Sequence, residues 1–387
     1  MPRIPIRNEP LDWLRGLLAA AIMLYHLAAW QIAQPDASSL LGRLGVYGVS
    51  MFFILSGLSI ALVYHRFITD GSTAGRFFVR RIFRIWPLLW LAIICVTGAR
   101  LLQGKPTDWT QLLLNLTTLF GFVSPANYIN TGAWSIGNEM VYYALTPAII
   151  AVYNRNKHAG NLITGATIAI GLVFSHALLH AEISLADQWV TYVNPLNNLF
   201  LYCCGIALYY NATHIRLSKA TCLAILAVGA SVFVWYPVAG DQIHILTGWN
   251  RVVFCIASVC MVLAFYKSAM PISRVLALPL TQLGLATYGV YLLHPVVWNA
   301  VSLLFDRLHV KPTPIASIGS TIICTLVFAW LSYRYYELPL INWGKKLTTS
   351  HSISGRQSND TGRPNHTPFA ARHAVPEGGL KVREHEQ

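Results

Sequence analysis

Three ionisable side chains interrupt an apolar segment near the N-terminus, and two of them could take part in chemistry. Residues 11–31 have the length and hydropathy of a membrane helix, yet they include Asp12, Arg15 and His26. Arg15 and His26 are eleven positions apart, so they lie on one helical stripe with a rise of about 16 Å between them. Asp12 can pair with Arg15 from i−3. Because ionisable groups inside membranes are usually functional, we interpret His26 as a candidate general base and Arg15 as its companion. The alternatives are packing for His26 and snorkelling for Arg15.

Three arginines, Arg80, Arg81 and Arg84, cluster just before the apolar segment 85–103. Arg81 and Arg84 are one turn apart and therefore share a helix face. Guanidinium groups form forked hydrogen bonds that match phosphate oxygens, so the cluster predicts a binding site for a phosphate-bearing anion. The alternative is that these cations only anchor the helix end at the cytoplasmic boundary.

Glu139 is a carboxylate five positions inside the apolar segment 134–153. A charge at that depth needs a partner or an aqueous cavity. His26 lies about 22 Å into its helix, which leaves about 8 Å of a membrane core of about 30 Å, and Glu139 lies at a similar depth from the outer side. Because the two residues lie at a similar depth, we expect Glu139 either to orient the imidazole of His26 or to hold the substrate from which His26 removes a proton. Trp134 begins the same segment and is typical of an interfacial anchor.

Three further polar residues, Ser56, His294 and Glu337, can each be explained by a structural role. Ser56, in the segment Phe-Phe-Ile-Leu-Ser-Gly, is a small residue that favours close helix packing, and it lacks the strand-to-helix elbow of a serine nucleophile. His294 precedes a proline within a predicted helix, and both a structural and a site role stay open. Glu337 is expected to form a local ion pair with Arg334 at i−3.

The composition indicates an integral membrane protein. The chain has 387 residues, of which 55% are hydrophobic and only 11% charged, and its mean hydropathy is +0.50; a soluble domain would need more charge to cover its surface. The seven cysteines fall in apolar segments without disulfide or metal-ligand spacing, so we expect buried thiols and no metal. The net charge of +13 is not gathered in a soluble basic domain, which argues against nucleic-acid binding.

We predict an all-α bundle of about ten transmembrane helices, with one membrane domain over residues 1–348 and a disordered cytoplasmic tail over 349–387. The apolar segment 109–123 is short and is interpreted as re-entrant or interfacial. Lys and Arg alternate between rich and poor loops, which places both termini in the cytoplasm. The first helix is too long for a cleavable signal. The ten predicted helices cover 11–31, 46–66, 85–103, 134–153, 161–180, 196–212, 219–238, 250–268, 283–305 and 315–336.

This layout places arginines at the inner end of the bundle and an imidazole with a carboxylate nearer the outer side. It suits acyl transfer from coenzyme A, whose phosphates would contact the arginines while its extended arm carries the acyl group toward His26. Neutral His26 would then act as general base on an acceptor hydroxyl. Two alternatives stay open: a transporter or flippase that uses the same polar residues, and a non-catalytic membrane scaffold.

The chain resembles the membrane acyltransferase-3 family from about Asn8 to Trp343. The first-helix pattern of an arginine, ten residues and a histidine occurs as Arg15 and His26. Six motifs stand in the order typical of the family, and together they are far more specific than any one alone. They read LDWLRG…YHL, GVSMFFILSG, RRIFRIWPLLW, WSIGNEMVYY, YGVYLLHP and YRYYELP.

The resemblance implies a multi-pass O-acyltransferase of the bacterial inner (plasma) membrane, with acyl-coenzyme A, most often acetyl-coenzyme A, as donor and a surface carbohydrate or lipid-linked glycan as acceptor. It implies that Arg15 and His26 are the essential pair, that the arginine cluster binds the donor, and that Glu139 belongs to the site. Some relatives carry an extracytoplasmic hydrolase-like domain after the membrane part. Here a short polar tail follows, so we expect the helices, with the loop 104–133, to handle the acceptor. Oligomeric state and the face of transfer are not predicted.

Overall fold

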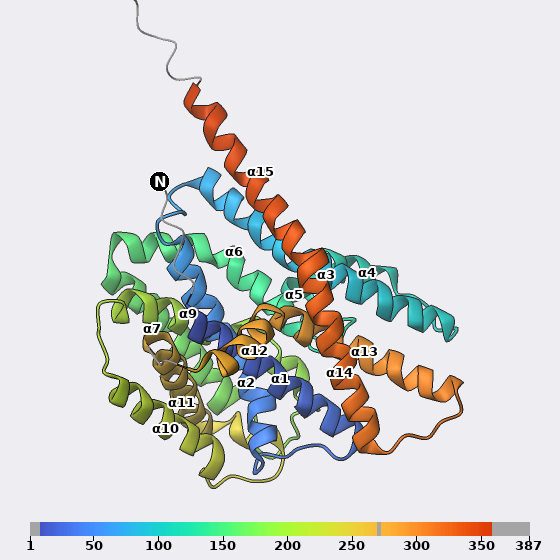
Figure 1. Ribbon diagram of the computed structural model, residues 1–387. Helices are drawn as coiled ribbons and strands as arrows, with labels where there is room; N and C mark the ends of the chain where they lie inside the picture. The colour runs from blue at the N-terminus through green and yellow to red at the C-terminus, as the bar shows by residue number, and fades with distance from the viewer. Residues whose placement is uncertain (1–7, 269–271, 358–387) are drawn as a thin grey trace, which may run out of the picture.

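The computed structural model describes residues 8–268 and 272–357, and helices make up most of this part of the chain (Figure 1). The elements are α1 (Glu9–Gln31), α2 (Leu40–Tyr64), α3 (Gly71–Leu102), α4 (Trp109–Leu116), α5 (Phe120–Val123), α6 (Trp134–Arg155), α7 (Lys157–Val173), η1 (Phe174–Leu178), α8 (Trp189–Tyr192), α9 (Pro195–Ala212), α10 (Lys219–Trp235), η2 (Gln242–Ile245), α11 (Gly248–Lys267), α12 (Arg274–Leu285), α13 (Thr287–Arg307), α14 (Pro314–Ser332), η3 (Tyr333–Glu337) and α15 (Leu338–Gln357).

Seven helices among the described residues are long and apolar enough to cross a membrane, which confirms an all-α, multi-pass membrane protein. Three are α1, α2 and α3; the others are α7 continued through η1, α11, α13, and α14 continued toward Thr349. The remaining three predicted spans correspond to α6, α9 and α10, which are not among these seven, so the number ten stays a prediction. The cytoplasmic placement of both termini also stays a prediction.

Glycines bring α2 and α9 into backbone contact at the centre of the bundle. A Cβ atom placed on Gly57 would lie 2.0 Å from the carbonyl oxygen of Tyr202, and one on Gly205 would lie 2.0 Å from that of Ile54. Only residues without a side chain allow so close a crossing, as is typical of small-residue interfaces in membranes. The small Ser56–Gly57 pair therefore marks a helix crossing, although Ser56 itself has a further contact described below.

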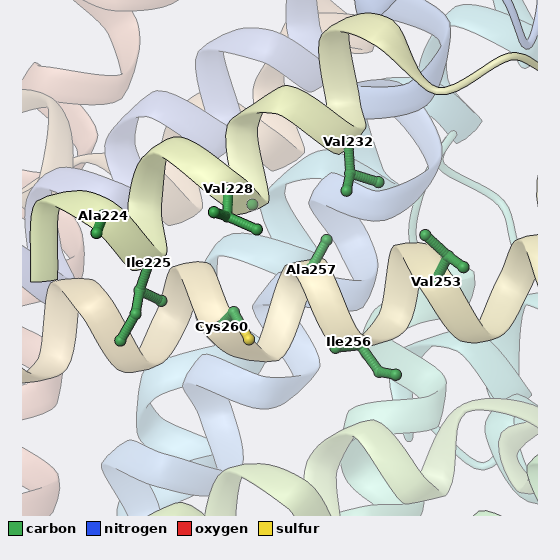
Figure 2. Close-up of a pocket in the computed structure, with 9 residues that line it drawn as sticks. Ala224, Ile225, Val228, Val232, Val253, Ile256, Ala257 and Cys260 are labelled. Atoms are coloured by element: carbon green, nitrogen blue, oxygen red, sulfur yellow. The ribbon is translucent and has the colours of Figure 1, made fainter. Parts of the chain in front are cut away.

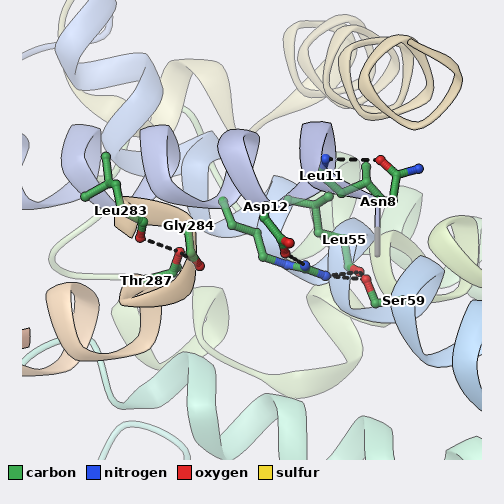
Figure 3. Close-up of polar contacts among 9 residues, drawn as sticks. Asn8, Leu11, Asp12, Leu55, Ser59, Leu283, Gly284 and Thr287 are labelled. Atoms are coloured by element: carbon green, nitrogen blue, oxygen red, sulfur yellow. Dashed lines mark hydrogen bonds and ion pairs between the residues drawn. The ribbon is translucent and has the colours of Figure 1, made fainter. Parts of the chain in front are cut away.

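Helix α1 is fixed by an N-terminal cap and by close packing against α12. The Asn8 side chain accepts a hydrogen bond from the backbone N–H of Leu11 and caps the helix. A Cβ atom on Gly16 would lie 2.8 Å from the backbone nitrogen of Gly284, so α1 and α12 also touch through glycine. Figure 3 shows the cap and the end of α12, where Thr287, the first residue of α13, donates to the carbonyl oxygens of Leu283 and Gly284.

Several helix ends differ from the predicted ones, and local chemistry explains the largest difference. Helix α3 begins at Gly71, well before the predicted start at residue 85, because Asp70 and Thr73 form a capping box. This extension places the three arginines of the cluster inside a helix rather than before it. The predicted helix 283–305 is divided at Ala286, between α12 and α13. Helix α15 runs to Gln357, past the tail boundary expected at residue 349, and residues 358–387 lie outside the described residues.

Two arginines within helices are buried, Arg43 on α2 and Arg251 on α11. Arg43 is 2% exposed and donates to backbone carbonyls of Ala37, Phe233 and Tyr236 at 2.6–3.0 Å, so it satisfies the end of α10. Arg251 is 3% exposed and donates to Asn197 at 2.6 Å. Both residues join segments of the bundle rather than facing solvent.

The cysteines are free thiols, and six of the seven are buried or partly buried, as predicted. Cys95 is the exception because it lies on an exposed face of α3.

Candidate active site

His26 on α1 and His294 on α13 form a direct pair. Nδ1 of His26 lies 2.8 Å from Nε2 of His294, and the ring centroids are 5.1 Å apart at an angle of 18°. His294 is fully buried, and its other ring nitrogen, Nδ1, lies 3.0 Å from the carbonyl oxygen of Val290. Of the two roles left open for His294, its contact with His26 favours a place in the site.

Two tryptophans extend this stack. The Trp30 ring lies nearly parallel to His26, with centroids 5.3 Å apart and an angle of 12°. Its centroid is 6.0 Å from that of His294 and 4.6 Å from that of Trp298. The stack limits rotation of the His26 ring and leaves its Nε2 without a hydrogen-bond partner among the residues of known placement. The spacing of aromatic residues in the sequence does not indicate such a stack, since its members come from two distant helices.

Arg15 is tied to α1 and α2 at the other end of the same stripe. Its Nη1 donates to Asp12 at 2.9 Å, which confirms the predicted i−3 ion pair. Its Nη2 donates to the hydroxyl of Ser59 and, at 3.4 Å, to the carbonyl oxygen of Leu55 (Figure 3). These bonds fix the guanidinium at one height along α2.

Glu139 on α6 accepts two hydrogen bonds at one oxygen. The hydroxyls of Ser56 and Tyr143 both lie 2.5 Å from its Oε1. Of the two predicted roles of Glu139, direct orientation of the imidazole is wrong, because Nδ1 of His26 lies against His294 instead. Its role in holding the acceptor stays a prediction. Ser56 thus has a polar partner in addition to its packing role. Tyr143 was missed by the sequence reasoning, although its position at i+4 from Glu139 could have indicated the contact.

Arg81 on α3 lies beside the Glu139 cluster. It donates to the hydroxyl of Tyr64 at 2.8 Å, and its guanidinium carbon lies 5.0 Å from the Tyr64 ring centroid and 5.8 Å from that of Tyr143. Such aromatic contacts stabilise a cation that is withdrawn from water. Its Nε is buried and has no hydrogen-bond partner among the described residues. This N–H group could therefore donate a hydrogen bond to an oxygen atom of a bound ligand.

The two other arginines of the cluster point to different surroundings. Arg84 has an exposed side chain, and its charge interacts with those of Arg15 and Glu337. Arg80 instead donates to Thr348 of α15 at 2.8 Å, and its guanidinium carbon stands 4.4 Å from the Phe67 ring centroid. Arg84 thus interacts electrostatically with Arg15, whereas Arg80 is engaged in helix packing.

Glu337 does not form the ion pair that its spacing from Arg334 predicted. It lies in the π-helical turn Tyr333–Glu337, whose i→i+5 hydrogen bonds put more residues in a turn and so move the i−3 neighbour off its face. Glu337 is 5% exposed and accepts from Ser332 at 3.2 Å, whereas Arg334 is exposed. The carboxylate interacts electrostatically with Arg84.

The loop 104–133 closes the bundle near α13. Asn130 donates to the carbonyl oxygen of Leu292 at 2.9 Å, and the Tyr291 hydroxyl donates to that of Gly132 at the same distance. In the same loop, burial raises the pKa of the Tyr128 phenol, which accepts from an indole N–H of α8 at 3.0 Å. The contacts of Asn130 and Gly132 thus join the loop to α13, which carries His294, and the contact of Tyr128 joins it to α8.

Trp134 is buried rather than placed at the membrane interface, so its interpretation as an anchor is wrong. It is 5% exposed, and its ring packs against Phe53, Trp189 and Tyr192 with centroids 5.4–6.1 Å apart. Two of these rings, Trp189 and Tyr192, belong to the short helix α8, which covers Trp134.

A separate apolar cavity of about 410 Å³ lies between α10 and α11 (Figure 2). Its walls include Val228, Val232 and Ile256, and Cys260 is the one sulfur-containing residue among those that line it. None of the polar residues considered above lines it. The described residues also contain no group of three His, Cys, Asp or Glu side chains that could hold a metal ion.

Comparison with known proteins identifies the family of this chain. The family model named acyltransferase domain (Acyl_transf_3) matches residues 8–334, which is most of the chain. The chain belongs to the acyltransferase-3 family. It is therefore a membrane acyltransferase, and the family implies an acyl donor.

Three relatives illustrate the range of similarity. BcsY of Komagataeibacter xylinus, whose name describes a membrane-bound transacylase, is 26% identical over 86% of this chain and 82% of its own length. The peptidoglycan O-acetyltransferase OatA of Listeria monocytogenes is 22% identical over 85% of this chain and 55% of its own. An O-acetyltransferase OatA of Staphylococcus aureus is 23% identical over 87% and 57%, respectively. The chain thus spans little more than half the length of the OatA proteins. No solved structure matches it.

Proposed function

We propose that this acyltransferase is an integral-membrane O-acyltransferase that moves an acyl group, most simply acetyl, from cytoplasmic acyl-coenzyme A to a hydroxyl of a surface carbohydrate or glycolipid. The observation that carries the proposal is the His26–His294 pair, which leaves one nitrogen of His26 without a hydrogen-bond partner among the described residues. Supporting it are the family membership and the relatives named as O-acetyltransferases. The inner membrane of a bacterium is the location that this function implies.

In this mechanism, His26 Nε2 removes the proton from the acceptor hydroxyl as the oxygen attacks the thioester carbonyl. A carbon–oxygen bond forms, and the carbon–sulfur bond breaks when the tetrahedral intermediate collapses. The imidazolium of His26 then returns the proton to the departing sulfur, so that coenzyme A leaves as a thiol. The imidazole is thereby regenerated without another reactant.

Arg81 and Arg84 are proposed to bind the phosphates of the donor. Arg84 makes no hydrogen bond to the described residues, and Arg81 retains an unpartnered Nε. Guanidinium groups whose N–H groups have no protein partner can bind phosphate oxygens through charge-assisted hydrogen bonds. Arg15, fixed by Asp12 and Ser59, would add positive charge between the donor phosphates and His26.

The test is label transfer by the purified, membrane-reconstituted full chain, supplied with radiolabelled acetyl-coenzyme A and an isolated surface glycan. We expect labelled glycan with the native protein and none with H26A, while both have the same thermal unfolding temperature. H158A is the matched control because His158 is exposed on α7, and it should transfer label normally. If no label moves but the glycan crosses the vesicle membrane, the chain is a transporter or flippase and the proposal is wrong.

A further inference from the structure

His294 has a hydrogen-bond partner for each ring nitrogen, and one partner fixes the position of its proton. Nδ1 lies 3.0 Å from the carbonyl oxygen of Val290. A carbonyl oxygen can only accept, so Nδ1 of His294 must carry the hydrogen. In the neutral ring, Nε2 of His294 then has a lone pair and no proton.

The same reasoning assigns the position of the ring proton of His26. Its Nδ1 lies 2.8 Å from the bare Nε2 of His294, so Nδ1 must be the donor in this bond. A neutral His26 with the proton on Nδ1 has an unprotonated Nε2. That nitrogen is the one available to remove a proton from an acceptor.

The argument requires that His294 be neutral, and its surroundings favour that form. The side chain has no exposed surface, and no carboxylate among the described residues pairs with it. A charge buried without a counter-ion is strongly destabilising. A protonated His294 would donate from Nε2 and force the hydrogen of His26 onto its own Nε2, which would remove the base.

Helical spacing explains why a carbonyl oxygen faces this ring. Val290 lies four residues before His294 on α13, and its carbonyl oxygen accepts from Nδ1 at 3.0 Å. The Nδ1 hydrogen therefore has its acceptor within the same helical turn. Pro295, which has no N–H, frees a different carbonyl, that of Tyr291.

We propose that His294 is a positioning residue that holds His26 in the tautomer with a free Nε2. This inference rests on the proposed function of His26 as a general base, but the tautomer can be measured without activity. His294 itself does not contact the substrates in this arrangement. Its effect reaches the reaction only through the hydrogen bond to His26.

Two substitutions separate the roles of the His294 nitrogens. The amide oxygen of H294Q reaches the position of Nε2 and can accept from His26. The shorter side chain of H294N places its amide near the Nδ1 position and can keep only the bond to Val290. We expect kcat for label transfer to fall by a factor on the order of 10² or more in H294N, as for loss of general-base catalysis. H294Q should retain at least about ten times the kcat of H294N, with the KM for acetyl-coenzyme A similar in both.

The second measurement is ¹⁵N solid-state NMR of histidine-labelled protein in lipid, with the His26 signals identified as those missing from H26A. We expect a protonated Nδ1 and an unprotonated Nε2 for His26 in the native protein. A protonated Nε2, or equal kcat values for H294N and H294Q, would overturn the inference. If no label is transferred by any variant while NMR gives the expected tautomer, the proposed function fails and the tautomer assignment stands.

Discussion

The hydroxyl of Ser56 lies 2.5 Å from Oε1 of Glu139, which joins α2 to α6 across 83 positions of the sequence. Tyr143 donates to the same oxygen and has its ring beside Arg81. The carboxylate therefore organises two hydroxyls and, through one of them, the surroundings of an arginine. We expect Glu139 to act by positioning these groups, since no hydrogen bond joins it to His26 among the described residues.

Removal of Glu139 should affect the protein more than removal of Ser56. E139A leaves two hydroxyls without their acceptor, whereas S56A removes one hydrogen bond to a charged group, worth about 1.5–3 kcal/mol. We expect E139A to lower both the unfolding temperature and the apparent affinity for acetyl-coenzyme A, and S56A to lower them less. Thermal unfolding and transfer kinetics at varied donor concentration check this. A larger effect of S56A would contradict the arrangement.

The arginine cluster should divide into donor-binding and packing residues. R84A is expected to raise the KM for acetyl-coenzyme A by about tenfold to a hundredfold, since a charge-assisted hydrogen bond contributes about 1.5–3 kcal/mol. R80A is the matched control, because Arg80 contacts Thr348 and Phe67 instead. It should change the KM by less than about threefold. A KM for R84A within about threefold of the native value would contradict donor binding by Arg84, and an equal rise in R80A would contradict the division of the cluster.

The α2–α9 crossing should not tolerate even one added methyl group. G57A would place Cβ 2.0 Å from a backbone oxygen, so the two helices must separate. We expect poor folding or a fall in unfolding temperature of many degrees. G165A on α7 is the control, since nothing lies within 4 Å of its added Cβ, and Ala favours a helix over Gly by roughly 0.5–1 kcal/mol. An equal response of the two variants in thermal unfolding would show that the crossing is loose.

Arg43 should contribute strongly to stability although it is not one of the reacting groups. R43M removes hydrogen bonds to four backbone carbonyls and leaves some of these acceptors buried. At about 1–3 kcal/mol for each unsatisfied group, we expect a loss of at least about 3 kcal/mol in unfolding free energy. Denaturant unfolding in detergent measures it. R307M, with an exposed arginine on α13, should differ little from the native protein.

The membrane class and the principal polar residues of the site could be predicted from the sequence, for a physical reason. Uninterrupted apolar segments report membrane spans directly, and ionisable residues stand out within them. Arg15 and its ion pair with Asp12 follow from helical spacing, which is local information. The same holds for the cluster that contains Arg81 and Arg84.

Contacts between distant helices could not be predicted in this way. His26 and His294 are 268 positions apart, and no periodicity in either segment indicates that they meet. The depth estimate instead paired His26 with Glu139, because depth along the membrane normal does not specify the neighbour around the bundle axis. Glu337 shows a different limit, since its π-helical turn changes which residues share a face.

The interlocked glycines of α2 and α9 also bear on where the bundle can change its width. Two backbones in contact form a rigid wall, and no rotamer change can separate them at that point. Any widening of the bundle when a substrate enters must therefore come from other pairs of helices.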